Sequence, residues 1–455
     1  MLPPVPARPA NVKFVTDFGA IPNDSVDDTD AIQRALDSLS PGDWLVFPAG
    51  LYLHSKSLHM RVANTVMWSE GAALRGTNAS DQAIWIEADG ASIYNFTLTA
   101  VTTTRKTTPW ESRISIFGGT NPGKLLHNNV IRGNRVVQGG DPGTPLANSA
   151  GSAGIFVYRA TNFLVAENTV ARSMADGIHV TAGSSNGRVL NNDVKETGDD
   201  MIAVVSYVGD PSTPASTVAA NLAALRASSL NHHITIAGNS VSGQYWGRGI
   251  SVVGGENVTI ENNAIDRTTH AAAIYLARET SYLTFGVHNV LVRNNTITDV
   301  ETTNPAYTAG TVSATAAKTG HGAIEIYSFV FTDEAAISSL SSALSVENIE
   351  VDSNTIARTR FDGFRIGTGW GKTNSFTATR SDGSTFARSY TGGQVGLLGL
   401  TGNKMSSIGG QAIAINNRPT ATNNVMCSAN TDDNAGASNS LCSGPKPTVV
   451  PACST

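Results

Sequence analysis

The chain has few charged residues, no excess of basic residues and no long apolar run, and each of these features excludes a class of function. Only 15% of its 455 residues are charged and the formal net charge is −5, which offers no basic patch for nucleic acid or an anionic membrane. No apolar run is long enough to span a bilayer. We therefore expect neither a nucleic-acid partner nor a membrane partner.

Cysteine is also scarce, and its placement is informative. The three cysteines, Cys427, Cys442 and Cys453, all lie in a Ser-, Asn- and Pro-rich C-terminal stretch. Cysteines clustered in a loop-like tail favour a disulfide, for which Cys427 with Cys442 is one option, and an oxidising compartment. The opening residues lack the apolar core of a signal peptide. We expect a secreted or periplasmic protein whose signal peptide is absent from this sequence, or one exported by another route.

What the sequence does have is an internal repeat. An Asn recurs in the frame apolar-x-x-Asn-x-apolar, and its shortest separations, from Asn168 to Asn192 and from Asn239 to Asn263, are 24 residues. Longer separations contain insertions at 209–230, 302–319 and 330–345, as expected for loops of a solenoid. The frame occurs at Asn134, Asn168, Asn192, Asn239, Asn263, Asn295, Asn354 and Asn403.

A short Val- and Ile-rich segment follows each Asn by about ten residues, as in Gly177-Ile-His-Val180 and Gly249-Ile-Ser-Val252. Its alternation of apolar and variable residues is typical of a half-buried strand, and no sustained helical period is present in the core region. With a short repeat and two or three strands in each copy, we predict an all-β fold, a single-stranded right-handed parallel β-helix. Its coils bury their Ile/Val face by stacking, and its Asn side chains form a ladder at a bend.

The ends of the solenoid need covering, because the first and last coils expose apolar interior. Residues 28–36 predict a short amphipathic helix, capped by Asp28 or Thr29, over the N-terminal end. We expect a disordered extension at 1–11, a β-helix catalytic domain at 12–425 with its cap at about 12–60, and a Cys-containing tail at 426–455.

Three carboxylates stand out within this repeat. Asp176 and Asp200 lie 24 residues apart, each two residues before an inward Ile, so they should be neighbours on adjacent coils. Asp199 is offset by one residue and should point the other way, which should place its carboxyl group about 6.5–9.5 Å from theirs. Close carboxylates repel one another, so one of them should keep its proton near neutral pH. The alternative interpretation is that they cap turns or bind a structural calcium ion.

The strand register also predicts which residues face a groove. The residue after the first inward apolar position of each coil points outward, which gives a column of Phe156, His179, Ala203, Ser251, Tyr275, Glu325 and Arg365. Polar and aromatic groups in a column suit a sugar-binding groove. Trp246 and Trp370 could add stacking surfaces. The residues expected to bind substrate are His179, Arg248, Tyr275, Arg278, His321, Glu325 and Arg365.

The N-terminal motifs resemble those of a known group of proteins. Asp17-Phe-Gly-Ala, Asp27-Asp-Thr-Asp-Ala-Ile-Gln and Phe47-Pro-Ala-Gly-Leu-Tyr are similar to the opening of polygalacturonases and of the wider pectate-lyase-like β-helix proteins. Ala175-Asp-Gly-Ile-His and Thr197-Gly-Asp-Asp-Met-Ile-Ala resemble the paired Asp motifs of β-helix glycoside hydrolases. In detail they are closest to the α-1,3-glucanase (mycodextranase) family, with dextranases and polygalacturonases more distant.

The resemblance implies roles for the three carboxylates. Asp199 would be the general acid, Asp176 and Asp200 would position the attacking water, and hydrolysis would invert the anomeric carbon without a required cofactor or catalytic metal. Polygalacturonases carry a Gly-His-Gly motif on the coil after the double Asp. In this chain that coil has Arg248, and the Gly-His-Gly motif, with His321, lies two coils further along. Their Arg-Ile-Lys motif is also not found. These departures favour a neutral α-linked polysaccharide, although the arginines leave an acidic sugar open.

Two other classes of function stay open. A polysaccharide lyase or epimerase acting on uronates would need an Arg or Lys base, often with calcium, and Arg248 and Arg278 would permit it. A non-catalytic, tailspike-like carbohydrate-binding solenoid is the third, because fold alone does not fix function.

Overall fold

The computed structural model describes residues 2–101, 105–106, 108–120, 123–136, 152–280, 282–304, 318–368, 375–379, 385–416 and 425–433. Trp370, Cys442 and Cys453 therefore lie outside the described residues.

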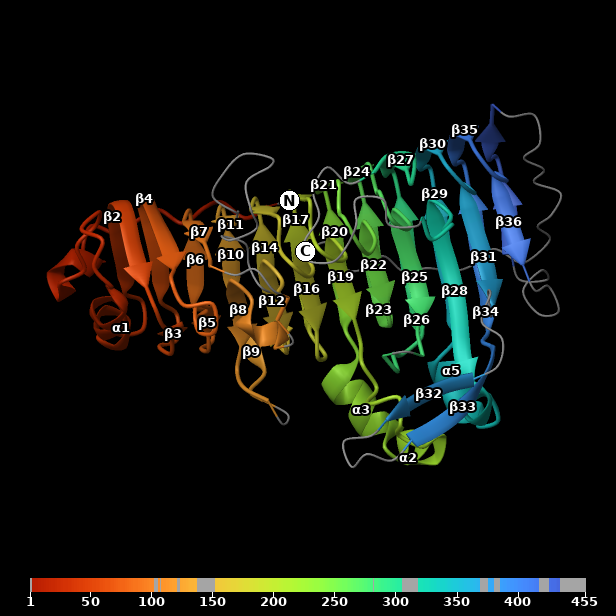
Figure 1. Ribbon diagram of the computed structural model, residues 1–455, viewed down its shortest axis with the longest axis horizontal. Coiled ribbons are helices and arrows are strands. Elements are labelled where there is room, and N and C mark those ends of the chain that lie inside the picture. Colours follow the sequence, from red (N-terminus) through yellow and green to blue (C-terminus); the bar gives the residue numbers. More distant parts are fainter. Residues whose placement is uncertain are drawn as a thin grey trace.

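The described chain winds into a stack of coils whose strands form two long, mainly parallel sheets, which confirms the predicted parallel β-helix (Figure 1). The sheet that carries the site runs through β3 (Leu58–Met60), β5 (Ile84–Ile86), β8 (Ile114–Phe117), β12 (Ile155–Tyr158), β16 (Ile178–Thr181), β19 (Ile202–Val205), β22 (Ile250–Val253), β25 (Ile274–Arg278), β28 (Ile324–Phe331), β31 (Phe364–Thr368) and β36 (Ile413–Asn416).

The larger sheet covers the other faces of the coils. Its strands are β1 (Lys13–Phe14), β2 (Trp44–His54), β4 (Val66–Gly76), β6 (Ser92–Tyr94), β7 (Thr97–Thr99), β9 (Leu126–His127), β10 (Val130–Arg132), β11 (Arg135–Val136), β13 (Ala160–Thr161), β14 (Leu164–Ala166), β15 (Thr169–Ala171), β17 (Ser185–Leu190), β18 (Asp193–Lys195), β20 (His232–Ala237), β21 (Ser240–Ser242), β23 (Gly255–Glu261), β24 (Ala264–Asp266), β26 (Val287–Arg293), β27 (Thr296–Val300), β29 (Val346–Asp352), β30 (Thr355–Thr359), β34 (Val395–Thr401), β35 (Lys404–Ile408), β37 (Val425–Ser428) and β38 (Thr431–Asp432).

The apolar residues of the repeat make the core. Ile178, Ile202, Ile250 and Ile274 occupy the same register position on successive coils and are fully buried. Each coil alone would expose this face, so stacking removes apolar surface that a single coil cannot hide. The core therefore fixes the register in which all other side chains are placed.

The predicted Asn ladder is confirmed. Asn192 Oδ1 accepts the backbone N–H of Asn168 at 3.0 Å and its Nδ2 at 3.0 Å, while Asn192 Nδ2 donates to Asn239 Oδ1 at 2.9 Å and to Val165 O at 3.0 Å. The same bonds continue through the later copies to Asn430, which lies one copy beyond the eight asparagines of the sequence frame. The ladder satisfies buried backbone groups at a bend that strand pairing cannot reach.

The N-terminal cap is α1 (Thr29–Asp37), which follows the 3₁₀ helix η1 (Val15–Phe18) and buries Ala31, Ile32, Ala35 and Leu36 as predicted. Asp28 stands at the N-cap position, but its carboxylate does not cap the helix. It accepts Ile21 N at 2.9 Å and Leu53 N at 3.2 Å, while Asp27 accepts Thr29 N at 2.9 Å. Asp28 thus fastens the loop before the helix to β2.

The ends of the chain differ in detail from the expected boundaries. Residues 2–11 form neither helix nor strand, yet Pro3 O accepts Arg132 Nη1 at 2.6 Å and Arg8 pairs with Glu70 at 3.5 Å. At the other end the expected boundary between 425 and 426 falls within β37, which pairs with β34 as part of a further coil. Cys427 on this strand is disulfide-bonded.

Insertions between coils pack together beside the site-bearing sheet and form what we call the accessory unit, residues 208–230, 283–285, 329–344 and 375–392 as far as they are described. It contains α2 (Ala215–Ala220), α3 (Leu222–Ser229), α4 (Thr332–Ala335), α5 (Ser338–Ala343) and the hairpin of β32 (Ser375–Thr379) and β33 (Thr385–Gly392), seen at the bottom of Figure 1. A second 3₁₀ helix, η2 (Pro109–Glu111), precedes β8. No helix within the described ranges is long and apolar enough to cross a membrane.

The ladder generates a stability prediction. Replacing Asn192 by Ala should lower the free energy of unfolding by about 2–3 kcal/mol, because the N–H and Nδ2 of Asn168 lose their shared buried acceptor. Guanidinium unfolding followed by far-ultraviolet circular dichroism measures this. Asn221→Ala, at the exposed end of α2, is the control and should have little effect. Equal effects of the two substitutions would contradict the role of the ladder.

Candidate active site

The parallel register brings the three carboxylates together. Ile178 pairs with Ile202, so the turns that precede β16 and β19 lie on top of one another. One oxygen of each of Asp176, Asp199 and Asp200 lies within 4.8 Å of the others. The prediction that they cluster on consecutive coils is confirmed, whereas the Asp199 side chain does not point away from the other two as expected.

The reason is local backbone geometry. β19 begins only at Ile202, so Asp199 lies in a turn where strand alternation does not apply. The N–H groups of Gly198 and Asp199 both donate to Ala175 O at 3.1 Å. This turn directs the Asp199 side chain to the same side as its neighbours.

Asp200 is the most firmly held of the three. It is only 4% exposed, and its carboxylate accepts Arg248 N at 2.6 Å and Ser251 Oγ at 2.5 Å. The Arg248 guanidinium lies 3.6 Å away. Burial raises the pKa of Asp200, while Arg248 and these hydrogen bonds oppose the rise. Its carboxylate is a fixed acceptor at the floor of the site.

Asp199 is more open and has a different partner. Its side chain is 22% exposed and Oδ2 accepts Arg105 Nη2 at 2.7 Å. Burial, followed by repulsion from Asp176 and Asp200, raises the pKa of Asp199 to about 7, with Arg105 opposing. Asp199 is therefore a carboxyl group that can hold a proton near neutral pH.

Asp176 shares a hydrogen bond with His179 on β16, the strand that directly follows it, with 2.5 Å between Oδ2 and Nδ1. The imidazole lies beside the Phe156 ring, 5.3 Å between centroids. His179 thus orients Asp176.

Gly247 lets a neighbouring turn approach the double Asp closely. Its φ is +75°, and a Cβ there would lie 2.5 Å from Asp200 N and 2.6 Å from Asp199 Oδ1. Only glycine tolerates both the angle and the contact. The Gly-Arg-Gly motif therefore serves to place the Arg248 backbone N–H against Asp200.

The carboxylates open into a cleft of about 650 Å³, and every residue expected to bind substrate contributes to its lining. Strand pairing confirms the register of the predicted column from Phe156 to Arg365. Phe156 lies outside the cleft lining, and Ser251 is buried beneath Asp200.

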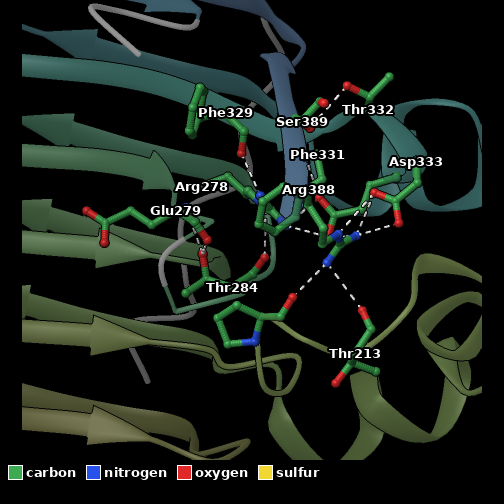
Figure 2. Close-up of polar contacts among 12 residues, drawn as sticks. Thr213, Arg278, Glu279, Thr284, Phe329, Phe331, Thr332, Asp333, Arg388 and Ser389 are labelled. Carbon is green, nitrogen blue, oxygen red and sulfur yellow. Dashed lines mark hydrogen bonds and ion pairs between the residues drawn. The ribbon is translucent and has the colours of Figure 1, made fainter. Parts of the chain in front are cut away.

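Arg278 has a role that differs from the expected one. It is fully buried and its guanidinium donates to Thr284 O at 3.2 Å, to Phe329 O at 2.7 Å and to both Glu334 oxygens at 2.8 and 2.7 Å (Figure 2). These donors hold the wall of the cleft and are not available to a sugar. Strand alternation explains this, because Arg278 has the parity of the inward Leu276 and not that of Tyr275.

The same alternation points to Glu279, which sequence analysis missed. Its Oε1 accepts a hydrogen bond from Arg248 Nη2, and the Arg248 guanidinium carbon lies 4.4 Å from the Tyr275 ring centroid. Arg248 is thereby held between Glu279 and Asp200. Arg105 was also missed, and no repeat or motif marks it, since it lies 94 residues before its partner Asp199.

A second polar group lies farther along the cleft. The His321 ring forms an edge-to-face contact with the Tyr275 ring, with 5.7 Å between centroids. The backbone N–H of His321 donates to the carboxylate of the buried Glu301 at 3.0 Å. Burial lowers the pKa of His321 to about 3, so its imidazole is neutral. Burial also raises the pKa of Glu325 to about 7, and its carboxylate accepts Gly322 N at 3.1 Å. These groups can exchange hydrogen bonds with sugar hydroxyls.

The structural calcium remains a prediction. The three carboxylates are oxygen donors of the kind that calcium prefers, but calcium takes about six to eight oxygens and both oxygens of Asp200 already accept hydrogen bonds.

Comparisons with known proteins agree with the fold. A family model described as rhamnogalacturonase A/epimerase, pectate lyase-like, matches residues 12–303. A comparison with curated protein sequences finds no match.

Solved structures with the same fold have diverse functions. The A-module of a mannuronan C-5 epimerase from Azotobacter vinelandii is 15% identical with a TM-score of 0.56, over 92% of this chain and 99% of that one. The catalytic domain of a GH87 α-1,3-glucanase in complex with tetrasaccharides is 16% identical with a TM-score of 0.61, over 94% and 71%. A surface adhesin of Streptococcus pneumoniae is 14% identical with a TM-score of 0.51, over 90% and 93%. These likenesses show the β-helix fold.

The raised pKa of Asp199 predicts a pH-dependent stability. A carboxyl group whose pKa rises from 3.8 to about 7 on folding contributes stability that is complete below pH 4 and is lost as pH rises through 7. Asp199→Asn removes this loss. The melting temperature of the variant relative to the wild type should therefore increase from pH 4 to pH 8 in scanning calorimetry.

The matched control is Asp193→Asn, which removes an exposed carboxylate on β18 outside the cleft. Its effect on the melting temperature should not follow the same trend. A relative melting temperature of Asp199→Asn that falls as pH rises would contradict the assignment.

Proposed function

Because the chain belongs to the rhamnogalacturonase A/epimerase family of pectate-lyase-like proteins, we propose that it is a glycoside hydrolase acting on an α-linked polysaccharide or oligosaccharide. The observation that carries the proposal is the cluster of Asp176, Asp199 and Asp200 within 4.8 Å at a cleft large enough for sugar residues. Such a cluster supplies both an acid and a base for hydrolysis.

Asp199 is the proton donor in this proposal. Its carboxyl protonates the glycosidic oxygen as the bond from that oxygen to the anomeric carbon breaks. A water held between Asp176 and Asp200 attacks the same carbon and gives its proton to one of these carboxylates. The hydrogen bonds from Arg248 N and Ser251 Oγ keep Asp200 in place to receive the water.

Before substrate binds, Arg105 is hydrogen-bonded to the carboxylate of Asp199, the proposed proton donor. Its 2.7 Å contact with Asp199 Oδ2 favours the ionised form. When a glycosidic oxygen replaces the guanidinium at this oxygen, burial and the two neighbouring carboxylates favour the protonated form. Substrate binding thereby favours the protonated form of Asp199, which is the form that can act as the acid.

Lyase or epimerase chemistry on the same fold receives less support from this cleft. Such a reaction removes a proton beside a carboxylate and needs an unprotonated base. The neutral imidazole of His321 lines the cleft, but its pKa of about 3 makes it a weak base. Glu279 and Asp200 raise the pKa of Arg248 well above its usual range despite its burial, so it stays protonated. No lysine lines the cleft in the part of the chain that the structure describes. The pKa values of Tyr207, Tyr275 and Tyr282 are also raised by burial.

A neutral substrate agrees best with the cations of the cleft. Arg105 is paired with Asp199, Arg248 with Glu279 and Asp200, and Arg365 donates to Gly320 O. A polyuronate would have to compete with these protein partners for each guanidinium. We therefore rank neutral α-glucans ahead of pectic substrates, and the disulfide-bonded Cys427 supports a secreted or periplasmic location.

The proposal predicts that Asp199→Asn reduces release of reducing ends by about 10²–10⁴-fold, since an amide cannot donate the required proton. The measurement is reducing-sugar release from a panel of α-glucans, galactans and pectins. Asp193→Asn is the control and should retain full activity.

Three results would overturn this proposal. Full activity of Asp199→Asn would exclude it as the acid. Products that absorb near 235 nm, the mark of an unsaturated uronate, would establish a lyase instead. Binding of these glycans without any product would favour the non-catalytic solenoid.

Stereochemistry is a separate prediction. Inversion rests on the resemblance of the Asp motifs to those of inverting β-helix glycoside hydrolases. We expect proton NMR of the first product to show the inverted anomer. A retained anomer would require one of the three carboxylates to act as a nucleophile.

A further inference from the structure

Exposed aromatic side chains gather at the cleft. Among the described residues, the exposed large apolar side chains include three aromatic ones, Tyr207, Trp246 and Tyr282, which are 38%, 43% and 60% exposed. All three line the cleft that contains the carboxylates. Exposed aromatic surface concentrated at one place marks a binding surface, and the apolar faces of sugar rings stack on it.

Tyr207 and Tyr282 form a pair although they come from different coils. Their ring centroids are 6.4 Å apart and the rings meet edge to face at 73°. The segment around Tyr282 folds back across the sheet edge, where Val208 N donates to Leu283 O at 2.7 Å and Phe285 N donates to Ser206 O at 3.0 Å. This short antiparallel pairing is what brings the two rings together.

The accessory unit holds that pairing in place. Val208, Leu283 and Phe285 are buried in its apolar cluster together with Phe331 and Leu340. The tyrosine pair thus stands on a second, small core that is separate from the coil interior. Without this core the backbone that carries both rings would have little to pack against.

Two arginines hold the accessory unit in place: Arg278 joins it to the coils, and Arg388 joins its own segments to one another (Figure 2). Arg278 joins Thr284 O to the buried Glu334, whose carboxylate also accepts Phe331 N at 2.9 Å. A buried ion pair stabilises little by itself, but breaking it is strongly unfavourable, so it locks the relative position of β25 and α4.

Arg388 joins separate segments of the accessory unit to one another. It lies over the Phe331 ring, 3.8 Å from the centroid, and pairs with the Asp333 carboxylate at 2.7 and 2.8 Å. It also donates to Pro211 O at 3.0 Å and to Thr213 O at 3.2 Å. One side chain from β33 therefore joins α4 to the segment before α2, and it does so outside the cleft lining.

The tyrosines line the same cleft as the three carboxylates. Burial, followed by the Asp176 charge, raises the pKa of the Tyr207 hydroxyl, and burial, followed by the Asp199 charge, raises that of the Tyr282 hydroxyl. Both hydroxyls keep their protons and can donate hydrogen bonds to sugar hydroxyls. The pair therefore combines an apolar surface with donors, as carbohydrate sites require.

We infer that Tyr207 and Tyr282 form a binding subsite for a pyranose ring beside the three carboxylates, and that the accessory unit holds this subsite in position. The inference rests on the proposed function, since it concerns the same cleft and the same glycan. The subsite gives the insertions a role in substrate recognition.

The test measures binding without turnover. In the Asp199→Asn background, isothermal titration calorimetry with an α-1,3-linked glucotetraose and with tetragalacturonate gives the affinity of each. Tyr282→Ala should weaken binding of the tetrasaccharide that binds by about 3- to 10-fold, the range of one aromatic contact. Tyr282→Phe keeps the ring and should retain most of the affinity, and Leu397→Ala, exposed outside the cleft, should retain all of it.

A further variant tests the holding role. Arg388→Ala removes a fastening without touching the cleft lining and should weaken binding in the same direction as Tyr282→Ala. Unchanged affinity in Tyr282→Ala, or no saturable binding of either tetrasaccharide, would overturn the subsite. Unchanged affinity in Arg388→Ala would overturn the role of the accessory unit. Binding that depends on Tyr282 in a wild-type protein that hydrolyses nothing would refute the hydrolase and leave the subsite intact.

Discussion

The parallel pairing of one coil on the next is the constraint on which the rest of this protein depends. Ile178 pairs with Ile202, and Ile202 pairs with Ile250 in the same way. Because side chains alternate along a strand, a shift by one residue would turn the groove face into the coil interior. The buried isoleucines and the Asn ladder therefore do more than stabilise the stack, since they also set the positions of the catalytic candidates.

That register forces like charges together, and the site is organised around the consequence. Three carboxylates within 4.8 Å cannot all ionise without a large electrostatic penalty. The protein responds unequally, with two strong hydrogen bonds to Asp200, a histidine on Asp176 and a displaceable arginine on Asp199. Unequal surroundings are what separate an acid from a base among chemically identical groups.

Sequence periodicity predicted the coil stack, the ladder and the carboxylate cluster, because each depends on a residue recurring at a fixed position. Arg278 was expected to bind substrate, but its guanidinium donates to protein groups, and alternation favours Glu279 instead. Arg105 could not be predicted, since it belongs to a segment outside the repeat and reaches Asp199 only in three dimensions.

The accessory unit was beyond prediction for a related reason. Its helices are short, and such helices form through packing against a core that only the folded chain assembles.

The carboxylate cluster and the pair of Tyr207 and Tyr282 are proposed to act on one glycan. A crystal structure of the Asp199→Asn protein with an α-linked tetrasaccharide tests this most directly. We expect a glycosidic oxygen within hydrogen-bond distance of the residue 199 side chain, with Arg105 displaced and a sugar ring against Tyr282. A tetrasaccharide bound elsewhere, or one whose glycosidic oxygens all lie away from residue 199, would contradict it.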